Sequence, residues 1–224
     1  MRSWLNRHLQ FLCRTEAWFD EVHARLAHQM QCGRGCTLCC YGLFDVSFAD
    51  ALLLAGGLRT LEARQREHAK ARAVSIHRTI DRAAPQLKAP FLLGSLPETL
   101  VDAVVLAADS PRCPLLGHND ECLVYQYRPL ACRLEGLPMV DAKDGLFGDW
   151  CELNFRNGVP PEDLPYLARD YYALQAEEDT STEVMADLLL GRRDRGLTVF
   201  IPSVITEFES FWQGLLARLE RAGA

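Results

Sequence analysis

The chain has 224 residues, of which 49% are hydrophobic and 24% charged, and its formal net charge at neutral pH is -6. This composition is ordinary for a globular protein with enough residues for one sizeable core. The negative charge argues against nucleic acid or an anionic membrane surface as a partner, and no segment stays apolar over the ~18 residues that a membrane span needs. An unknown protein or small molecule is the expected partner.

The N-terminal segment does not have the pattern of a secretory signal. Arg7, His8 and Arg14 interrupt it, and it has neither a continuous apolar stretch nor a small-residue cleavage site. We therefore expect a cytoplasmic protein with reduced thiols. Nine cysteines in a reducing compartment favour metal binding over disulfides.

The N-terminal half is predicted to be helical outside one cysteine-rich stretch. Hydrophobic residues recur every three, four or seven positions over residues 4–30, which predicts an amphipathic helix. A short helix is expected over 47–55, with Ser47 as its cap and Gly56 as its exit. A longer, basic helix is expected over 58–84, ended by Pro85, and another over 97–108.

The remainder of the chain is also predicted to be helical, apart from a second cysteine-bearing segment. Residues 113–136 have no sustained period, and residues 139–147 read as a hairpin with Asp144 and Gly145 in its turn. Helices are expected over 161–193, broken near 180–182, and over 203–222. The sequence thus predicts a mostly α, single helical domain over 1–224, in which a cysteine-cluster region at 32–151 is flanked by helix 4–30 and helices within 161–222.

Eight of the nine cysteines fall into clusters. They are Cys32, Cys36, Cys39 and Cys40 in the first group, Cys113, Cys122 and Cys132 in the second, and Cys151 shortly after. Two or three residues between thiols let a tight turn bring both sulfurs to one metal, and Gly33 and Gly35 permit such turns. Zinc sites use this spacing, and so do iron–sulfur clusters, which often add a cysteine followed by proline, as at Cys113-Pro114.

The adjacent pair Cys39-Cys40 carries further information. Neighbouring side chains diverge on a helix or a strand, so the two do not easily chelate one tetrahedral ion. They can bind different metal atoms of a multinuclear centre, or Cys40 can be a buried residue that binds no metal. The pair therefore favours an iron–sulfur or polynuclear zinc centre.

Other residues near the cysteines have two interpretations each. Four arginines can compensate thiolate charge or be solvated: Arg34, Arg112, Arg128 and Arg133. His118 is a ligand or a solvated loop residue, and Tyr125 and Tyr127 form a relay or pack around the metal. Cys13, on the first helix, is expected to be a core residue. No catalytic triad can be read from sequence order, and no nucleotide-binding loop is present.

The stretches CGRGCTLCCYG and CPLLGHNDECLVYQYRPLACR together resemble the YkgJ-like cysteine-cluster family, which is named for a proposed zinc- or iron-chelating domain with a CxxCxxCC motif. Residues at three places carry the second half of the resemblance: Cys113, Pro114 and Leu116; Cys122 and Tyr125; and Arg128, Pro129, Cys132 and Arg133. It covers about 32–151. Three residues rather than two separate Cys32 from Cys36, an insertion that the intervening glycines can absorb.

The resemblance implies a metal site and leaves the reaction open. The family is often labelled as iron–sulfur oxidoreductases, and one branch, the flagellin lysine methylases, uses a similar domain for protein modification. We expect all eight clustered cysteines as candidate ligands of an iron–sulfur cluster, of the four-iron type, or of zinc. The two functions compatible with this are a redox or protein-modifying enzyme, which needs a cleft beside the cluster, and a non-catalytic scaffold stapled by zinc in a closed site.

Overall fold

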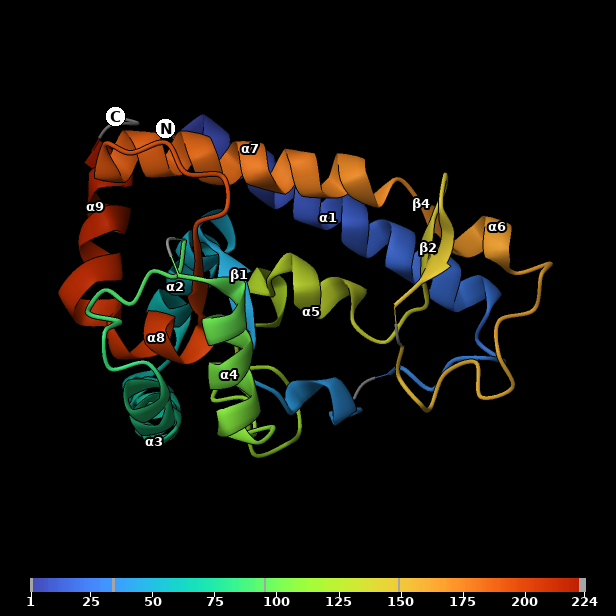
Figure 1. Cartoon of the computed structure of the whole chain (residues 1–224), viewed down its shortest axis with the longest axis horizontal. Helices are drawn as coiled ribbons and strands as arrows, with labels where there is room; N and C mark the ends of the chain where they lie inside the picture. The colour runs from blue at the N-terminus through green and yellow to red at the C-terminus, as the bar shows by residue number, and fades with distance from the viewer. Residues whose placement is uncertain (1, 34, 95, 149, 222–224) are drawn as a thin grey trace.

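The computed structural model describes residues 2–33, 35–94, 96–148 and 150–221. Helices dominate it, so the mostly α prediction is confirmed (Figure 1). The helical segments are α1 (Arg2–Arg25), η1 (Leu38–Cys40), α2 (Phe48–Thr60), α3 (Ala63–Ala83), α4 (Glu98–Ala108), η2 (Tyr125–Tyr127), α5 (Leu130–Leu134), α6 (Leu164–Leu167), α7 (Tyr171–Leu190), α8 (Ile201–Thr206), η3 (Phe208–Trp212) and α9 (Gln213–Arg221). Within these ranges no helix combines the length and apolarity needed to cross a membrane.

Two small sheets complete the fold. β1 (Asp45–Ser47) pairs antiparallel with β5 (Thr198–Phe200), which the sequence pattern did not reveal. β2 (Met139–Asp141) and β3 (Gly145–Phe147) form the predicted hairpin, and β4 (Ala168–Arg169) adds a parallel strand to β2. The Asp141 carboxylate accepts hydrogen bonds from the amides of Lys143 and Asp144, which fixes the turn.

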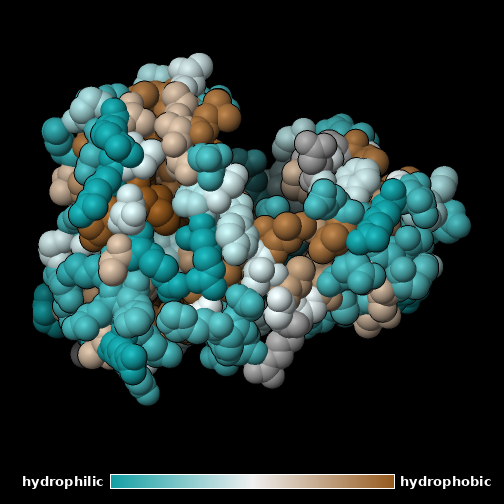
Figure 2. Space-filling model, turned by 90° about the horizontal axis from the view of Figure 1, so that it is seen from below, coloured by the Kyte–Doolittle hydropathy of each residue, from teal (hydrophilic) through white to brown (hydrophobic). Residues whose placement is uncertain are grey.

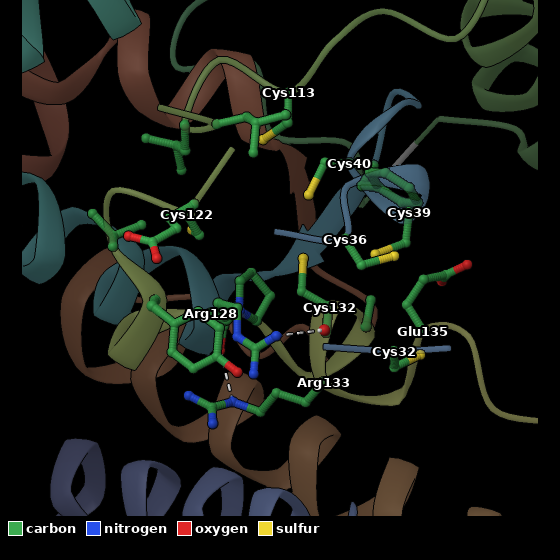
Figure 3. A pocket seen from close by; sticks show the side chains of 18 of the residues that line it. Cys32, Cys36, Cys39, Cys40, Cys113, Cys122, Arg128, Cys132, Arg133 and Glu135 are labelled. Carbon is green, nitrogen blue, oxygen red and sulfur yellow. Dashed lines mark hydrogen bonds between the residues drawn. The ribbon is translucent and has the colours of Figure 1, made fainter. Parts of the chain in front are cut away.

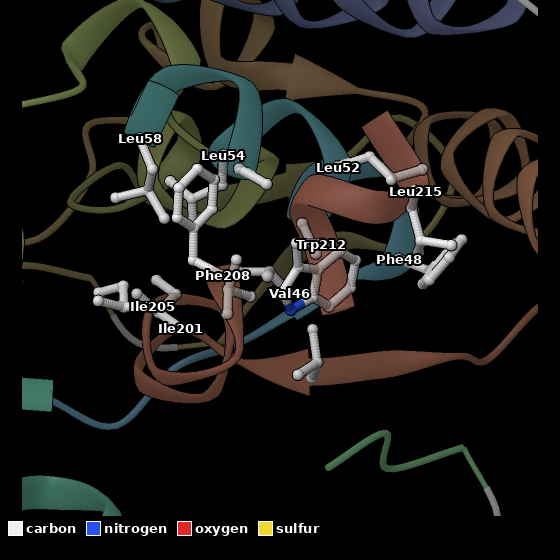
Figure 4. Close-up of a cluster of buried hydrophobic side chains, with 14 of the residues drawn as sticks. Val46, Phe48, Leu52, Leu54, Leu58, Ile201, Ile205, Phe208, Trp212 and Leu215 are labelled. Atoms are coloured by element: carbon white, nitrogen blue, oxygen red, sulfur yellow. The ribbon is translucent and has the colours of Figure 1, made fainter. Parts of the chain in front are cut away.

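The main core surrounds α2. Ser47 caps this helix as expected, since its hydroxyl accepts a hydrogen bond from the Asp50 amide at 3.1 Å. Most side chains of α2 are buried because α1, α7, α8 and α9 all contact it. Figure 4 shows Phe48 and Trp212 within this core, and their ring centroids lie 5.5 Å apart. The helix that follows the first cysteine group is therefore held on several sides.

A second set of contacts ties α1 to the cysteine region. α1 and α7 run side by side along one edge of the molecule (Figure 1), and α1 also packs against the short helix α5. His8 Nε2 lies 2.8 Å from Asp50 Oδ1, and the other carboxylate oxygen of Asp50 accepts the Leu130 amide at 2.7 Å. Both His8 and Asp50 are fully buried. The first turn of α5 is thereby fixed to α2 through Asp50, which His8 joins to α1.

Several predicted boundaries are wrong, and tertiary contacts explain them. α2 continues past Gly56 to Thr60, because Gly57 lets the helix approach the ring of Tyr127 so closely that a Cβ there would lie 2.9 Å from it. The next helix begins only at Ala63, where Glu62 and Gln65 form a capping box. The first helix ends at Arg25 rather than at residue 30.

The C-terminal third also differs from expectation. No break occurs near 180–182: α7 is continuous, and the buried hydroxyl of Thr182 accepts the Ala49 amide at 3.5 Å. The last predicted helix is instead divided into α8, a π-helical turn η3 and α9. The Trp212 amide bonds to the Glu207 carbonyl, five residues back, which turns the indole into the core.

Candidate metal centre

Seven of the eight clustered cysteines line one cavity of about 610 Å³. They are Cys32, Cys36, Cys39, Cys40, Cys113, Cys122 and Cys132. Figure 3 shows their side chains around this space, and Figure 2 shows the molecular surface hollowed between a larger and a smaller part of the molecule. Cys151 does not line the cavity; it lies beside Gly136, as Cys32 does.

The first group is shaped by two tight turns. The Cys36 amide bonds to the Gly33 carbonyl at 3.0 Å, and the Cys40 amide bonds to the Thr37 carbonyl at 2.8 Å. Gly35 takes a φ of +85°, which only glycine adopts without strain. The turns let the chain present several thiols to one side within nine residues, as their spacing predicts.

The second group is brought to the first by backbone pairing. The Cys113 amide donates to the Cys40 carbonyl at 2.8 Å, and Tyr41 forms an antiparallel bridge with Arg112. Leu116 and Cys122 form a second bridge, which closes the loop between Cys113 and Cys122. Cysteines more than seventy positions apart are therefore neighbours because of main-chain hydrogen bonds, without help from their thiols.

Asn154 is a site residue that the sequence reasoning missed. It is 1% exposed, and its side-chain NH2 donates to Cys32 Sγ at 3.1 Å and to the Gly136 carbonyl at 2.6 Å. Its side-chain oxygen accepts the Gln31 amide at 2.8 Å, and its own amide bonds to the Cys151 carbonyl. A lone asparagine three residues after a cysteine gives no signal in a single sequence. In the structure it joins the segments that carry Cys32 and Cys151.

Burial makes four of these thiols hard to ionise without a cation. It raises the pKa of Cys113 to about 11, and it also raises the pKa values of Cys32, Cys122 and Cys132. A bound metal ion offsets this cost because it stabilises the thiolate directly. The donor set is thus suited to a metal that binds thiolates.

The adjacent pair behaves differently from the rest. The interaction between the two thiols is the main cause of both shifts: it raises the pKa of Cys39 and lowers the pKa of Cys40. Glu135 also lines the cavity near Cys39, and burial raises the pKa of its carboxyl. Glu135 is a second cavity residue that the sequence reasoning did not single out.

The arginines near the cysteines mostly bind main-chain carbonyls of the cysteine-bearing segments or the Glu16 carboxylate on α1. Arg112 donates to the carbonyls of Leu116 and Gly117 at 3.1 and 2.7 Å. Arg128 and Arg133 both bind the Glu16 carboxylate on α1. Arg34 lies outside the described residues.

Two arginines also act on the thiols themselves. The charge of Arg128 lowers the pKa values of Cys122 and Cys132 against the effect of burial. Arg72, which the sequence reasoning passed over, acts in the same direction on Cys113 and donates to the Leu116 carbonyl at 2.8 Å. Charge compensation therefore comes from one expected arginine and from one on α3.

Of the other residues considered in the sequence, Tyr125 lines the cavity, whereas Cys13, His118 and Tyr127 do not. Cys13 is exposed, so the expectation of a core residue is wrong: the neighbouring Phe11 and Leu12 occupy the buried face of α1. His118 is exposed and does not line the cavity. Tyr125 lines the cavity and is 56% exposed, with the Arg128 guanidinium 3.8 Å from its ring centroid, whereas Tyr127 packs against α2.

One hydrogen-bonded serine and histidine occur away from the cysteines. His77 Nε2 lies 3.1 Å from Ser203 Oγ, and its Nδ1 lies 3.4 Å from Asp81 Oδ1. A serine, a histidine and a carboxylate follow one another here as they do in a hydrolase triad, but Ser203 is fully buried in the core. A substrate carbonyl does not reach that hydroxyl, so the arrangement joins α3 to α8.

The cysteines surround a space instead of meeting at one point. Among the described residues, no three His, Cys, Asp or Glu side chains converge to hold a single metal ion. All nine cysteines are free thiols. Their number, their softness as donors and their shared cavity fit zinc or iron–sulfur chemistry.

A family model described as "CxxCxxCC: Putative zinc- or iron-chelating domain" matches residues 31–152, which is the region that contains the cavity cysteines and Cys151. The match confirms the family suggested by the sequence motifs. Neither a curated protein nor a solved structure matches the chain.

Proposed function

Because the chain belongs to the CxxCxxCC family, described as zinc- or iron-chelating, we propose that it is an iron–sulfur protein whose centre serves redox or protein-modifying chemistry. The cavity of about 610 Å³ beside the thiols carries this proposal. A metal that only staples a fold is enclosed by its ligands, whereas a working centre needs space for a reactant. The eight clustered cysteines are its proposed ligands.

The spread of the thiols supports a cluster over a single zinc ion. Zinc–sulfur bonds of ~2.3 Å bring four thiolates to within about 3.8 Å of one another in a tetrahedral site. A four-iron cluster binds each thiolate to a different iron, so its ligands stand further apart. Seven thiols around one open volume suit the second arrangement. The Cys113-Pro114 step is also typical of cluster-binding segments.

The walls of the cavity are consistent with a reactant that enters beside the cluster. Arg128 stands on one side and the Glu135 carboxyl on another (Figure 3), and Tyr125 also lines the cavity. Phe44 and Leu115 supply apolar surface. A small molecule or a side chain of a protein partner fits these walls, and the reduced thiols suit the cytoplasm.

The test is metal and acid-labile sulfide analysis, with a visible spectrum, on protein purified without oxygen. Iron with a matching amount of sulfide and a brown colour is the expected result. Zinc alone, in a colourless sample never exposed to air, would favour the alternative, a non-catalytic scaffold whose irregular segments are stapled by metal.

A further inference from the structure

We propose that the eight cysteines form two separate four-thiolate metal centres, divided between the adjacent residues Cys39 and Cys40. The first set is Cys32, Cys36, Cys39 and Cys151. The second set is Cys40, Cys113, Cys122 and Cys132. The division rests on the proposed function only in requiring that the thiols bind metal, either zinc or an iron–sulfur cluster in each set.

The first set is assembled around Asn154 and Gly136. Asn154 holds the Cys32 sulfur at 3.1 Å and bonds through its amide to the Cys151 carbonyl. A Cβ placed on Gly136 would lie 3.3 Å from Cys32 Sγ and 3.7 Å from Cys151 Cβ, so both cysteines face the same glycine. Burial is the main cause that raises the pKa of Cys32, and the charges of Cys36, Cys151 and Cys39 raise it further.

The second set is assembled by the backbone pairing of the two cysteine-rich segments. The hydrogen bond from the Cys113 amide to the Cys40 carbonyl places these residues side by side, and the Leu116–Cys122 bridge folds the loop back over them. Cys132 completes the set from α5, and it interacts electrostatically with Cys113 and Cys122. Cys39 has the largest effect on the pKa of Cys40 and lowers it, while the charges of Cys113, Cys122 and Cys132 raise it.

The two sets also rest on different parts of the core. Cys113, Cys122 and Cys132 pack against the core around α2. Cys32 packs against a separate cluster that contains Val22 and Phe155. Figure 3 shows the same separation: Cys40, Cys113, Cys122 and Cys132 surround one part of the cavity, while Cys32, Cys36 and Cys39 lie on the side of Glu135.

Charge favours this division over one merged centre. Four thiolates around one zinc ion or one oxidised four-iron cluster carry a formal charge of about -2, and eight thiolates on one such core would carry far more. Each smaller charge has its own compensation: Arg72 and Arg128 beside the second set, and the Asn154 amide group at the first. Cys39 and Cys40 are adjacent in the sequence, so the centres would be neighbours.

The experiment compares the metal content per chain of the wild-type protein and of four variants, all purified without oxygen. Cys36→Ser removes a ligand of the first set, Cys122→Ser removes one of the second set, and a third variant carries both changes. Cys13→Ser is the matched control, because Cys13 is an exposed thiol outside both sets. Each single variant should retain about half of the wild-type metal, and the double variant should bind almost none.

Failure of the division and failure of the proposed function give different results. Metal-free wild-type protein would overturn both. Metal-bearing wild-type protein in which one serine substitution removes all of the metal, or in which the double variant loses no more than a single one, would overturn the division alone.

Wild-type protein provides a second measurement that does not depend on variant folding. It is partly depleted with a chelator, its freed thiols are alkylated, and the chain is weighed and mapped by mass spectrometry. If there are two centres, a half-loaded species should appear in which the four thiols of one set are labelled together. These are either Cys32, Cys36, Cys39 and Cys151, or Cys40, Cys113, Cys122 and Cys132. Labelling that mixes the two sets would overturn the division.

Discussion

Cys132 lies where three buried features meet: the thiol cavity, the first turn of α5, and the Asp50 carboxylate that holds that turn. Cys132→Ser should therefore lose metal and stability together, because metal binding and folding are coupled when ligands come from separate segments. We expect a loss of about 2–4 kcal/mol in the free energy of unfolding, with a lower metal content. Thermal unfolding and metal analysis check this, with Cys13→Ser as the control that changes neither. An unchanged melting temperature with full metal content would remove Cys132 from the ligand set.

Glu178 gives a prediction about pH. Burial raises its pKa to about 9, and the neighbouring Asp50 carboxylate adds to the rise. The unfolded carboxyl ionises near pH 4.5, so folding takes up a proton between the two values, and this group's contribution to stability falls as pH rises from about 4.5 to 9. Glu178→Gln is neutral in both states and should remove that fall, which stabilises the protein by about 1–3 kcal/mol at pH 8.

Chemical unfolding of wild type and Glu178→Gln at pH 5 and pH 8 measures this difference. The two curves should lie close together at pH 5 and separate at pH 8. A gap that stays constant between the two pH values would show that Glu178 does not titrate in this range.

At the scale of elements, the two adjacent glycines of α2 form a natural comparison. A Cβ on Gly57 would lie 2.9 Å from Tyr127, while a Cβ on Gly56 would meet nothing within 4 Å. Gly57→Ala should destabilise the protein by about 1–3 kcal/mol because it separates α2 from the segment between Cys122 and Cys132. Gly56→Ala should instead stabilise it by about 0.5–1 kcal/mol, since alanine favours a helix interior. Denaturant midpoints of the two variants test this, and equal effects would contradict the close packing of Tyr127.

The same glycines illustrate what the sequence can and cannot predict about elements. Hydrophobic periodicity predicted the helices, Ser47 predicted the start of α2, and Asp144-Gly145 predicted the hairpin, because each signal acts within a few residues. Near its end α2 places Gly57 against Tyr127, and in α7 the Thr182 hydroxyl accepts the Ala49 amide. Such distant partners are invisible to a local pattern, as is the pairing of β1 with β5.

At the scale of the whole molecule, the cavity predicts that solutes reach the centre. Ala131 is exposed and lines the cavity on α5, so Ala131→Trp should narrow it without removing a thiol. We expect unchanged metal content and a several-fold slower bleaching of the proposed iron–sulfur cluster by a water-soluble oxidant. Ala103→Trp, at an exposed position on α4 away from the cavity, is the control and should bleach at the wild-type rate. Equal bleaching rates in wild type and both variants would mean that the oxidant does not enter through the cavity.

The cysteines of the candidate site were predictable from the sequence, but the residues around them, such as Asn154 and Glu135, and the arrangement of the thiols were not. Short spacings identified the cysteines, and the structure brings seven of them to one cavity. Which thiols neighbour one another depends on main-chain pairing such as that of Cys40 with Cys113, and on the Asn154 side chain. Neither leaves a trace in residue spacing, and Cys39 and Cys40, adjacent in sequence, have different neighbours.

The hydrogen bond between Asn154 and Cys32 joins positions 122 residues apart, and it has a consequence for biosynthesis. A chain that emerges from the ribosome N-terminus first exposes Cys32, Cys36 and Cys39 long before Cys151 and Asn154 are made. During that interval the early thiols are open to oxidants and to whichever soft cation arrives first. We therefore expect the thiols to bind their correct metal only after translation has passed residue 154.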